Sequence, residues 1–570
     1  MLRDTLKYDA EQTPPAHLAL SLAFMHVLLV FDAIIFIPNV LGKTVGVEPG
    51  ALAFITFATI LNAALFTFLQ SRTRLGIGSG FLLFTGSYSA FVLCSVDAVK
   101  MGGLPLLATM SLLTVPVVFL YTYFIRHFRH IITPAVGGVV VLLIATAMVP
   151  IGLSLWAGDI PPGGAPSLAR VGTGAATVLC LTLLMLFGRP AIRLWSPLIA
   201  MAAGYGTAFV TGGLEFTHSA HAAWFGLPDF GAWPGIATNL DISHLPLLLA
   251  FGMGMLASVI ESTGNIMLVQ QISTRDFRRV SYDKVQSGLY CDGLSKLTAG
   301  LMGTAVPSIY CDNLPLIEMT GVASRRIGAM GAGILLLLAF MPKVGGVILD
   351  MPGPVIGGFL VVIAALLFHA GFGLVAMTKL SNQHGLILGL SLVVGLVAGG
   401  KSFFPGVVPA SLSPLLQNSV AMGGFTAFVL STLAYLSPKR GVTGAFALEM
   451  SEIPRIHALL ATGRDKLGLT QERLDALCLC CEEVFAHMVQ AHSGSGHSLS
   501  LRVALKEEGC FAEMVCGHMM DDINNFALPE SLLQASPDEL GNLGLALFAR
   551  YARDVKHLEI SGYSYISFVL

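Results

Sequence analysis

Two acidic side chains stand inside segments that are otherwise apolar, and they are the first candidates for chemistry. Glu261 lies in the middle of residues 251–271, and Asp312 lies in residues 303–326, which proline interrupts. A charged side chain within a bilayer is costly, so such residues usually mark a substrate or ion pathway. Hydrophobic segments broken by Gly and Pro also point to the binding site of a transporter. The two features together predict a polar site inside a membrane.

Carboxylates in this setting could read the hydrogen-bond donor edge of a flat heterocycle. Ring N–H groups would donate to the carboxylates, and backbone N–H groups at the start of a half-helix would donate to ring carbonyls. Neighbouring polar and aromatic residues complete the candidate substrate site: Ser87, Tyr88, Glu261, Asn265, Tyr310, Asp312 and Asn313. We expect Asn265, one turn after Glu261, to orient that carboxylate by hydrogen bonding.

The same acids are candidates for coupling transport to an ion. A carboxyl group in a medium of low dielectric constant binds a proton more readily than it does in water. Glu261 and Asp312 could therefore carry a proton, although carboxylate and carbonyl oxygens could hold Na+ instead. Residues 246–270 contain no Lys or Arg, so Lys296 in the next segment is the nearest candidate for a purely structural ion pair with Glu261.

Two motifs at these acids resemble those of the xanthine/uracil permeases, the nucleobase–ascorbate transporter family. Residues 261–265 (Glu-Ser-Thr-Gly-Asn) are similar to its acidic eighth-helix motif, and residues 312–321 are similar to its tenth-segment signature. The resemblance covers roughly residues 15–437. Asp312 stands where the family usually has Gln or Glu, and Pro315 where it has Gly. The resemblance implies a homodimeric secondary transporter that imports a nucleobase such as uracil or xanthine.

The composition indicates an integral membrane protein. The chain has 570 residues, of which 54% are hydrophobic and 12% are charged, whereas soluble domains carry about 25% charged residues. A spanning helix needs about 20 apolar residues. About fourteen candidate segments begin near Leu18, Ala51, Ile77, Leu104, Ile132, Val171, Trp195, Leu247, Gly288, Tyr310, Ile327, Pro354, Gly385 and Gly423.

The third and tenth of these segments share a pattern. Residues 76–90 and 303–320 each run from Gly to apolar to polar residues and then to a helical pattern, as an inverted repeat predicts. Thr85 or Ser87, and Asp312 or Asn313, are the expected helix N-caps. The resemblance implies an all-α polytopic fold of two inverted repeats of seven segments, with short strands in segments three and ten.

Lys and Arg concentrate in every second connector, which predicts that both termini are cytoplasmic. Residues 212–244, for example, contain neither residue. We expect a multi-pass protein of the cell inner membrane without a signal peptide. The net charge of −2 and the lack of a basic tract argue against nucleic-acid binding.

The chain divides into a tail (1–16), a membrane domain (17–437), a linker (438–450) and a small α/β cytosolic domain (451–570). This last domain resembles the histidine-kinase-like ATPase domain of anti-sigma-factor kinases. His487 stands where that family holds its metal with Asn, and the Asp of the family's Asp-x-Gly box is absent at Cys516-Gly517-His518, although a Gly-rich turn remains at 541–545. We therefore expect a degenerate domain that contacts a regulatory protein, with ATP binding doubtful. Cys478, Cys480 and Cys481 fit buried thiols better than a zinc site, because no second Cys-x-x-Cys motif occurs in the chain to form a pair of such motifs.

Two other functions stay open at this point. A receptor could bind a nucleobase and signal through the cytosolic domain, or the protein could be an anion transporter of the sulfate-permease type. The paired acids argue against an anion site. An enzyme is the weakest interpretation, and neither a cofactor nor a metal is expected.

Overall fold

The computed structural model describes the chain except residues 1–5, 74–75, 126–133, 159–164, 166, 190–191, 194, 215, 276–279, 311–312, 377–381, 401–417, 437–440, 493–497, 507–508, 518–547, 549 and 561–562. The chain forms two compact units. The first comprises Met1–Arg275 and Lys284–Tyr435, and the second Asp276–Asp283 and Leu436–Leu570.

The first unit is a bundle of helices. Its main helices are α1 (Ala16–Val45), α2 (Pro49–Gln70), α3 (Val92–Tyr123), α5 (Pro134–Ala157), α6 (Leu168–Phe187), α8 (Ser196–Val210), α10 (Leu245–Ser273), α11 (Tyr282–Met302), α12 (Leu314–Thr320), α13 (Arg325–Ala339), α15 (Gly353–Ala376), α16 (Asn382–Gly399) and α18 (Ser419–Leu436). Two short helices, α9 (His218–His221) and α14 (Pro342–Leu349), complete it. Within the described residues, 8 helices are long and apolar enough to cross a membrane. The prediction of a multi-pass membrane protein is confirmed.

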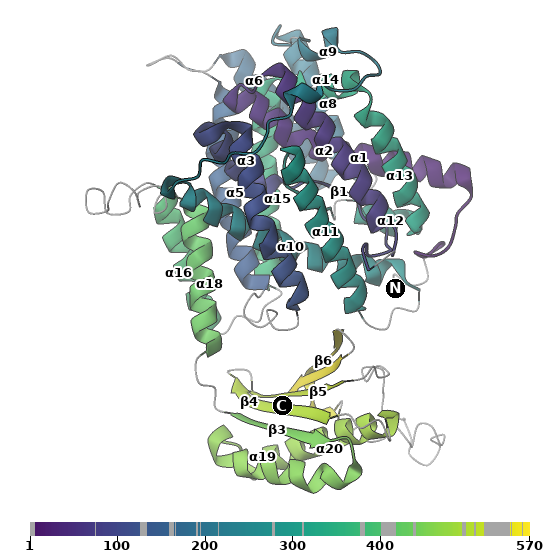
Figure 1. The fold of residues 1–570 in the computed structure, drawn as a ribbon, viewed down its shortest axis with the longest axis vertical. Coiled ribbons are helices and arrows are strands. Elements are labelled where there is room, and N and C mark those ends of the chain that lie inside the picture. The colour runs from purple at the N-terminus through teal and green to yellow at the C-terminus, as the bar shows by residue number, and fades with distance from the viewer. Residues whose placement is uncertain are drawn as a thin grey trace, which may run out of the picture. The chain divides into compact units, whose positions relative to one another are not determined.

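Close packing between helices relies on small residues. The helix α5 packs along α15, α2 along α13, and α10 along α3 (Figure 1). The helix α11 reaches α3 through Gly293 and Gly300, where an added Cβ would lie 3.0 Å from Phe119 and 2.8 Å from Leu112. Small residues let helix backbones approach in membranes, where no hydrophobic effect drives the helices together.

The strands expected in segments three and ten are present. Strand β1 (Thr85–Ser87) pairs antiparallel with β2 (Pro307–Ile309), and Gly86 lies opposite Ser308. The third and fourth predicted segments share α3, which is interrupted at Gly102 and Gly103 by non-helical backbone angles. The predicted start at Ile132 lies outside the described residues.

The non-helical stretch before β1 is held by Gln70. The Ser79 backbone N–H donates to the Gln70 side-chain oxygen at 3.1 Å, and the Gln70 amide donates to the Gly288 carbonyl at 2.9 Å. Gly78 has a φ of 90°, and an added Cβ would lie 2.1 Å from two carbonyl oxygens. Irregular backbone at membrane depth requires such internal partners, so Gln70 and Gly78 allow the segment to leave the helix.

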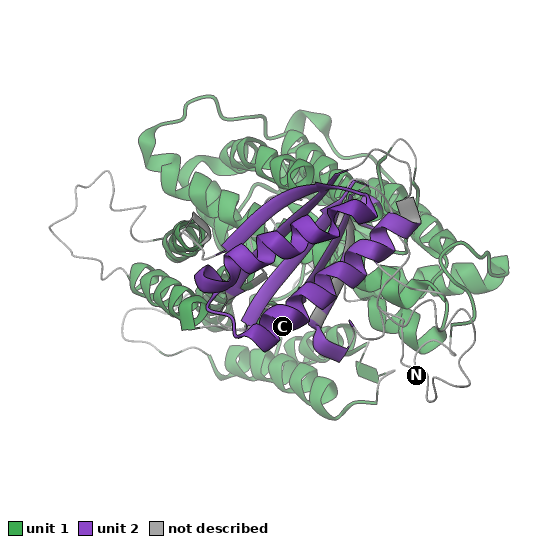
Figure 2. Cartoon of the chain, turned by 90° about the horizontal axis from the view of Figure 1, so that it is seen from below, with its two compact units in different colours: residues 1–275, 284–435 green, residues 276–283, 436–570 purple. Residues whose placement is uncertain are grey.

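The second unit is an antiparallel sheet with two helices on one face (Figure 2). The expected elements are α19 (Ile453–Leu467), α20 (Gln471–His492), β4 (Ser498–Lys506), β5 (Gly509–Cys516) and the hairpin of β6 (Arg553–Ile560) with β7 (Tyr563–Val569). The predicted linker 438–450 is wrong in its centre, because β3 (Gly441–Ala447) pairs with β4 and gives the order β3-β4-β5-β7-β6. The turn at 541–545 lies outside the described residues.

The cysteines of α20 belong to the core of this unit. Cys480 and Cys481 are fully buried among residues such as Phe485 and Leu501, and Cys478 is partly buried against them. Burial, followed by the charge of Glu483, raises the pKa of Cys480 to about 12. The prediction of buried thiols is confirmed for Cys480 and Cys481, since a protonated buried thiol behaves as a small apolar group.

The tightest point of the strand crossing gives a stability test. A Cβ at Gly86 would lie 2.6 Å from Ile34 and 2.7 Å from the Tyr310 hydroxyl. Overpacking costs about 1–3 kcal/mol, so Gly86→Ala should lower the melting temperature of the detergent-solubilised protein by several degrees. Gly333→Ala in α13 is the matched control, because a Cβ there meets no atom within 4 Å. Equal melting temperatures for the two variants would contradict the packing argument.

Candidate functional site

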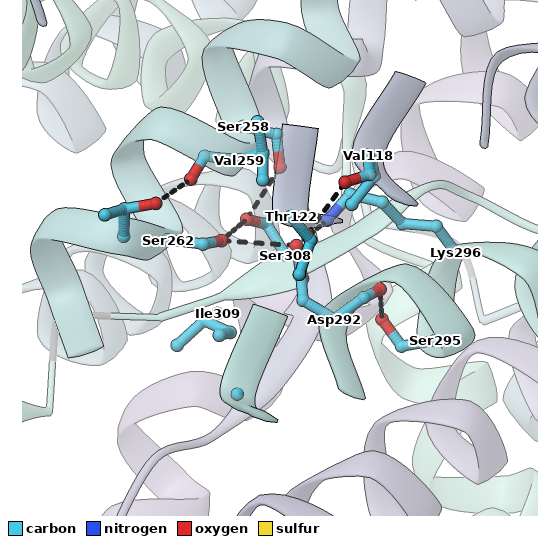
Figure 3. Close-up of polar contacts among 12 residues, drawn as sticks. Val118, Thr122, Ser258, Val259, Ser262, Asp292, Ser295, Lys296, Ser308 and Ile309 are labelled. Carbon is cyan, nitrogen blue, oxygen red and sulfur yellow. Dashed lines mark hydrogen bonds and ion pairs between the residues drawn. The ribbon is translucent and has the colours of Figure 1, made fainter. Parts of the chain in front are cut away.

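Hydrogen bonds of short polar side chains connect the helix α10 to strand β2 (Figure 3). The Ser258 and Ser308 hydroxyl oxygens lie 2.9 Å apart, and those of Ser262 and Ser308 lie 3.2 Å apart. The Asn265 amide donates to the Ile309 carbonyl at 3.1 Å. These bonds fix the helix that carries Glu261 against the strand that precedes Asn313.

Tyr88 joins Glu261 to the end of β1. Its hydroxyl donates to the Glu261 carboxylate, and its backbone N–H donates to the Val306 carbonyl at 3.0 Å. Tyr88 is the N-cap of the single-turn helix η2 (Ser89–Phe91) and is buried. The structure thus brings together two predicted site residues that are 173 positions apart in the chain.

Asn265 has a different role from the expected one. We predicted that it orients Glu261, but its amide bonds the Ile309 carbonyl and makes no hydrogen bond to Glu261. The free carbonyl at the end of a three-residue strand is the acceptor that attracts it. Asn265 positions α10 rather than the carboxylate itself.

Ser87 and Tyr310 form a second link across the crossing. The Tyr310 hydroxyl donates to the Ser87 carbonyl at 2.7 Å, and the Tyr310 backbone N–H donates to the Phe84 carbonyl at 2.8 Å. The Ser87 hydroxyl donates to the Ile34 carbonyl of α1 at 2.5 Å. The prediction that Thr85 or Ser87 caps a helix is therefore wrong, since both lie in β1.

Asn313 lies directly before α12 and next to His26 of α1. Its amide nitrogen is 3.3 Å from His26 Nδ1, and the imidazole stacks on Phe84 with ring centroids 5.7 Å apart. Asn313 is the N-cap position of α12, as predicted, but its side chain makes no capping bond. Asp312, the other predicted acid, lies outside the described residues.

Several polar atoms near this point lack a protein partner. Asn313 Oδ1, His26 Nε2 and Thr85 Oγ1 are buried without a hydrogen bond to any described residue. Leaving a buried polar atom unsatisfied costs about 1–3 kcal/mol. A polar ligand that reached these atoms would recover that free energy, which makes this side of the crossing a candidate for ligand contact.

An ion pair that sequence analysis did not anticipate lies beside the serines. Asp292 and Lys296, one turn apart in α11, form an ion pair with both side chains fully buried. The Ser262 hydroxyl donates to Asp292 at 3.4 Å. Opposite charges at positions i and i+4 of a helix are a recognisable sequence pattern. This spacing is the sequence feature that could have indicated Asp292.

Lys296 is therefore not simply the partner of Glu261. Its direct partner is Asp292, while its charge also interacts with that of Glu261. The described part of the site thus contains two acids and one lysine. Among the described residues, no group of three or more His, Cys, Asp or Glu side chains is placed to hold a metal ion.

These features define a multi-pass membrane permease: apolar helices long enough to span a bilayer, two interrupted segments that pair at their breaks, and the half-buried Glu261 and buried Asp292 beside that pairing. Comparison with known proteins gives the family. The family model for xanthine/uracil permeases, described as "Permease family", matches residues 17–399. The chain belongs to this family, and it is a transporter rather than an enzyme.

Curated relatives match most of the chain. The xanthine permease XanP of Escherichia coli is 28% identical over 444 residues, which cover 75% of this chain and 94% of that protein. The xanthine permease XanQ of Escherichia coli is 26% identical, with coverage of 75% and 93%. The uric acid permease PucJ of Bacillus subtilis is 25% identical over 457 residues, with coverage of 78% and 98%.

Solved structures show a more distant likeness. The murine anion transporter Slc26a9 in its inward-facing state gives a TM-score of 0.46 at 12% identity, covering 71% of this chain and 70% of that one. The transmembrane domain of the cyanobacterial bicarbonate transporter BicA gives a TM-score of 0.39 at 13% identity, covering 70% and 97%.

The bond between Tyr88 and Glu261 leads to a test of the site. Tyr88→Phe removes the hydroxyl that donates to the half-buried Glu261 carboxylate, a loss of about 1 kcal/mol or more. We expect an apparent substrate affinity lower by about fivefold or more, measured by uptake into proteoliposomes. Tyr205→Phe is the matched control, since it also loses one hydroxyl bond, to the Val347 carbonyl at 2.5 Å in another part of the unit. Equal uptake by the two variants would remove Tyr88 from the site.

Proposed function

We propose that this protein imports a nucleobase of the xanthine, uric acid or uracil type across the cell inner membrane by proton symport. The observation that carries the proposal is the placement of Glu261 at the β1–β2 crossing, where Tyr88 holds it. The similar curated proteins are named as xanthine and uric acid permeases. Their names support the same class of substrate here.

Recognition would use the hydrogen-bonding edge of the ring. Glu261 would accept from ring N–H groups, and Asp312 would do the same from the opposite segment. Tyr88 and Tyr310 would border the ring, while Asn313 has an amide oxygen without a described partner that can accept a further N–H. A site that bonds each ring group rejects analogues lacking one, because a buried polar group is then left unpaired.

Proton coupling follows from the setting of Glu261. The carboxylate lies in α10, a helix without Lys or Arg, and accepts from the Tyr88 hydroxyl. Protonation would remove its charge before the site changes its exposure from one side of the membrane to the other, and a buried neutral carboxyl costs far less than a buried ion. Sodium coupling is the alternative, and the ion dependence of uptake separates the two.

The proposed architecture is fourteen segments in two inverted repeats of seven. The β1–β2 pairing supports it, because segments three and ten are broken at corresponding points. The helix packing supports it as well. The contact of α2 with α13 and the contact of α11 with α3 would correspond to each other in the two repeats, and α5 packs against α15, which would be its counterpart. Both termini would be cytoplasmic, as the Lys and Arg distribution predicts, and the protein would act as a homodimer.

The second unit supports an alternative role as a sensor. It has its own apolar core, so it could report substrate occupancy to a cytosolic regulatory protein. A sensor would bind a nucleobase without accumulating it. The anion-transporter alternative is weaker, because the buried lysine of the site is already paired with Asp292.

We further propose that the second unit is a degenerate ATPase-type domain. Glu483 and His487 both lie in α20, where the resembling kinases would place a Glu and a metal-holding Asn. Burial and then the charge of Glu482 raise the pKa of Glu483. Imidazole in place of the Asn amide oxygen removes a hard ligand that Mg²⁺ prefers.

Uptake into proteoliposomes tests the transport proposal. Wild-type protein should accumulate labelled xanthine, uric acid or uracil when the outside is acidic, and a proton ionophore should abolish accumulation. Glu261→Gln should lose uptake while its melting temperature stays close to that of the wild type, because the amide keeps the size of the side chain. Binding without accumulation would favour the sensor, and wild-type uptake by Glu261→Gln would refute the assignment of this acid.

A nucleotide titration tests the second unit. The full-length protein should show no saturable binding of a fluorescent ATP analogue with Mg²⁺ at micromolar concentrations, because His487 replaces the metal-holding Asn. Reversion of that position with His487→Asn should raise the affinity if the rest of the pocket survives. Tight binding by the wild type would show a working nucleotide site and overturn this part of the proposal.

A further inference from the structure

Lys296 places its amino group in the interior of the first unit. Its side chain has no exposed surface, and its amino group bonds the Asp292 carboxylate. The same carboxylate accepts from Ser262 of α10, the residue next to Glu261. The other lysine of α11, Lys284, lies at the start of the helix over the Phe81 ring, 4.9 Å from the centroid. Of the two lysines of α11, Lys296 is therefore the one that lies beside the acids of the strand crossing.

The group bonded to Lys296 is a carboxylate, and hydroxyl oxygens continue the network from it toward β2. Asp292 supplies a carboxylate, and its Oδ1 has no partner among the described residues. Ser262 bridges Asp292 at 3.4 Å and Ser308 at 3.2 Å (Figure 3). Carboxylate and neutral oxygen ligands suit hard metal cations. The position would therefore suit Na+, but the lysine side chain fills it.

The neighbouring carboxylates explain why a lysine is tolerated at this buried position. A buried ammonium without counter-charges would be strongly disfavoured, and two carboxylates without a cation would repel one another at short range. Lys296 bonds one acid and interacts with the other, so a single side chain compensates charge on both α10 and α11. Helix α10 itself contains no Lys or Arg.

We propose that Lys296 is a fixed cation of the coupling site. It supplies from the chain the positive charge that a bound sodium ion would otherwise bring to Glu261 and Asp292, so transport by this protein does not require Na+. The inference rests on the proposed transport function, and it identifies one residue that determines which ion drives it. Removal of the lysine side chain should then leave an oxygen-lined space that Na+ can enter.

The test compares sodium with choline at equal ionic strength, using purified full-length protein. The wild-type melting temperature and uptake should be the same in both salts. Lys296→Ala should melt several degrees lower in choline and regain stability with saturable dependence on NaCl, and its uptake should rise at least about tenfold with Na+, since a gain of 1.4 kcal/mol in binding corresponds to tenfold. Lys296→Arg keeps the charge and should remain indifferent to Na+.

Two control variants separate this role from a structural one. Lys284→Ala removes a lysine of the same helix outside the site and should show no sodium response. The double variant Asp292→Asn with Lys296→Ala removes both charges of the pair, which proteins tolerate better than the loss of one. It should also show no sodium response, because the carboxylate ligand is gone. If Lys296→Ala does not fold, Lys296→Gln takes its place in the same comparison.

Sodium dependence of the wild type in either measurement would overturn the proposal. So would a Lys296→Ala or Lys296→Gln protein that folds and is as indifferent to Na+ as the wild type. The melting measurement needs no substrate. Failure of the wild type to accumulate any nucleobase would therefore defeat the transport proposal while the sodium response still decides the role of Lys296.

Discussion

The pairing of two three-residue strands is the constraint on which the membrane unit depends. A segment that leaves the helix inside an apolar medium exposes N–H and C=O groups that water cannot satisfy. Here the breaks face one another, so β1 and β2 satisfy each other, and the Tyr88 and Tyr310 backbone N–H groups bond Val306 and Phe84 just beyond the strands. Each interruption is tolerated because the other strand supplies its hydrogen-bond partners. That mutual dependence brings residues near positions 87 and 309 into one site.

Charge adds a second level of dependence between helices. Glu261 and Ser262 are neighbours in α10, and the Ser262 hydroxyl donates to Asp292 of α11, which forms an ion pair with Lys296. The serines of α10 and β2 then connect the carboxylate of Asp292 to the strand crossing. Two helices and a strand therefore form one electrostatic unit, and a change in any member alters the field at the others. Networks of this kind are sensitive to the loss of one partner.

Sequence reasoning was most successful where a feature was local. Glu261 was visible as an acid in an apolar run, and the Gly and Pro punctuation indicated the breaks that became β1 and β2. Partners distant in the chain were not visible. Ser87 was expected to cap a helix because its nearest neighbours were considered, yet its hydroxyl bonds Ile34 of α1. Asn265 likewise bonds Ile309 of β2 rather than Glu261, one turn away.

In the second unit, the edge strand β3 likewise depends on a partner that is distant in the chain. The Gly-rich sequence of β3 does not indicate a strand, since Gly weakens strand propensity. Seven consecutive pairings with β4 determine the strand instead, and these depend on residues more than 50 positions away. The helices and the terminal hairpin were predictable because their periodicity is contained within each element.

The distribution of donors and acceptors at the crossing bears on what the site can recognise. Ser87, Tyr88, Tyr310 and Asn265 each donate a side-chain hydrogen bond to an acceptor within the protein. Asn313 Oδ1 is by contrast an acceptor without a described partner. Among the described side chains of the crossing, the available group is thus an acceptor, which suits a ligand edge that carries N–H groups. Oxidised purine rings carry such N–H groups, so the internal bonds that stabilise the strand crossing also favour the class of ring proposed as substrate.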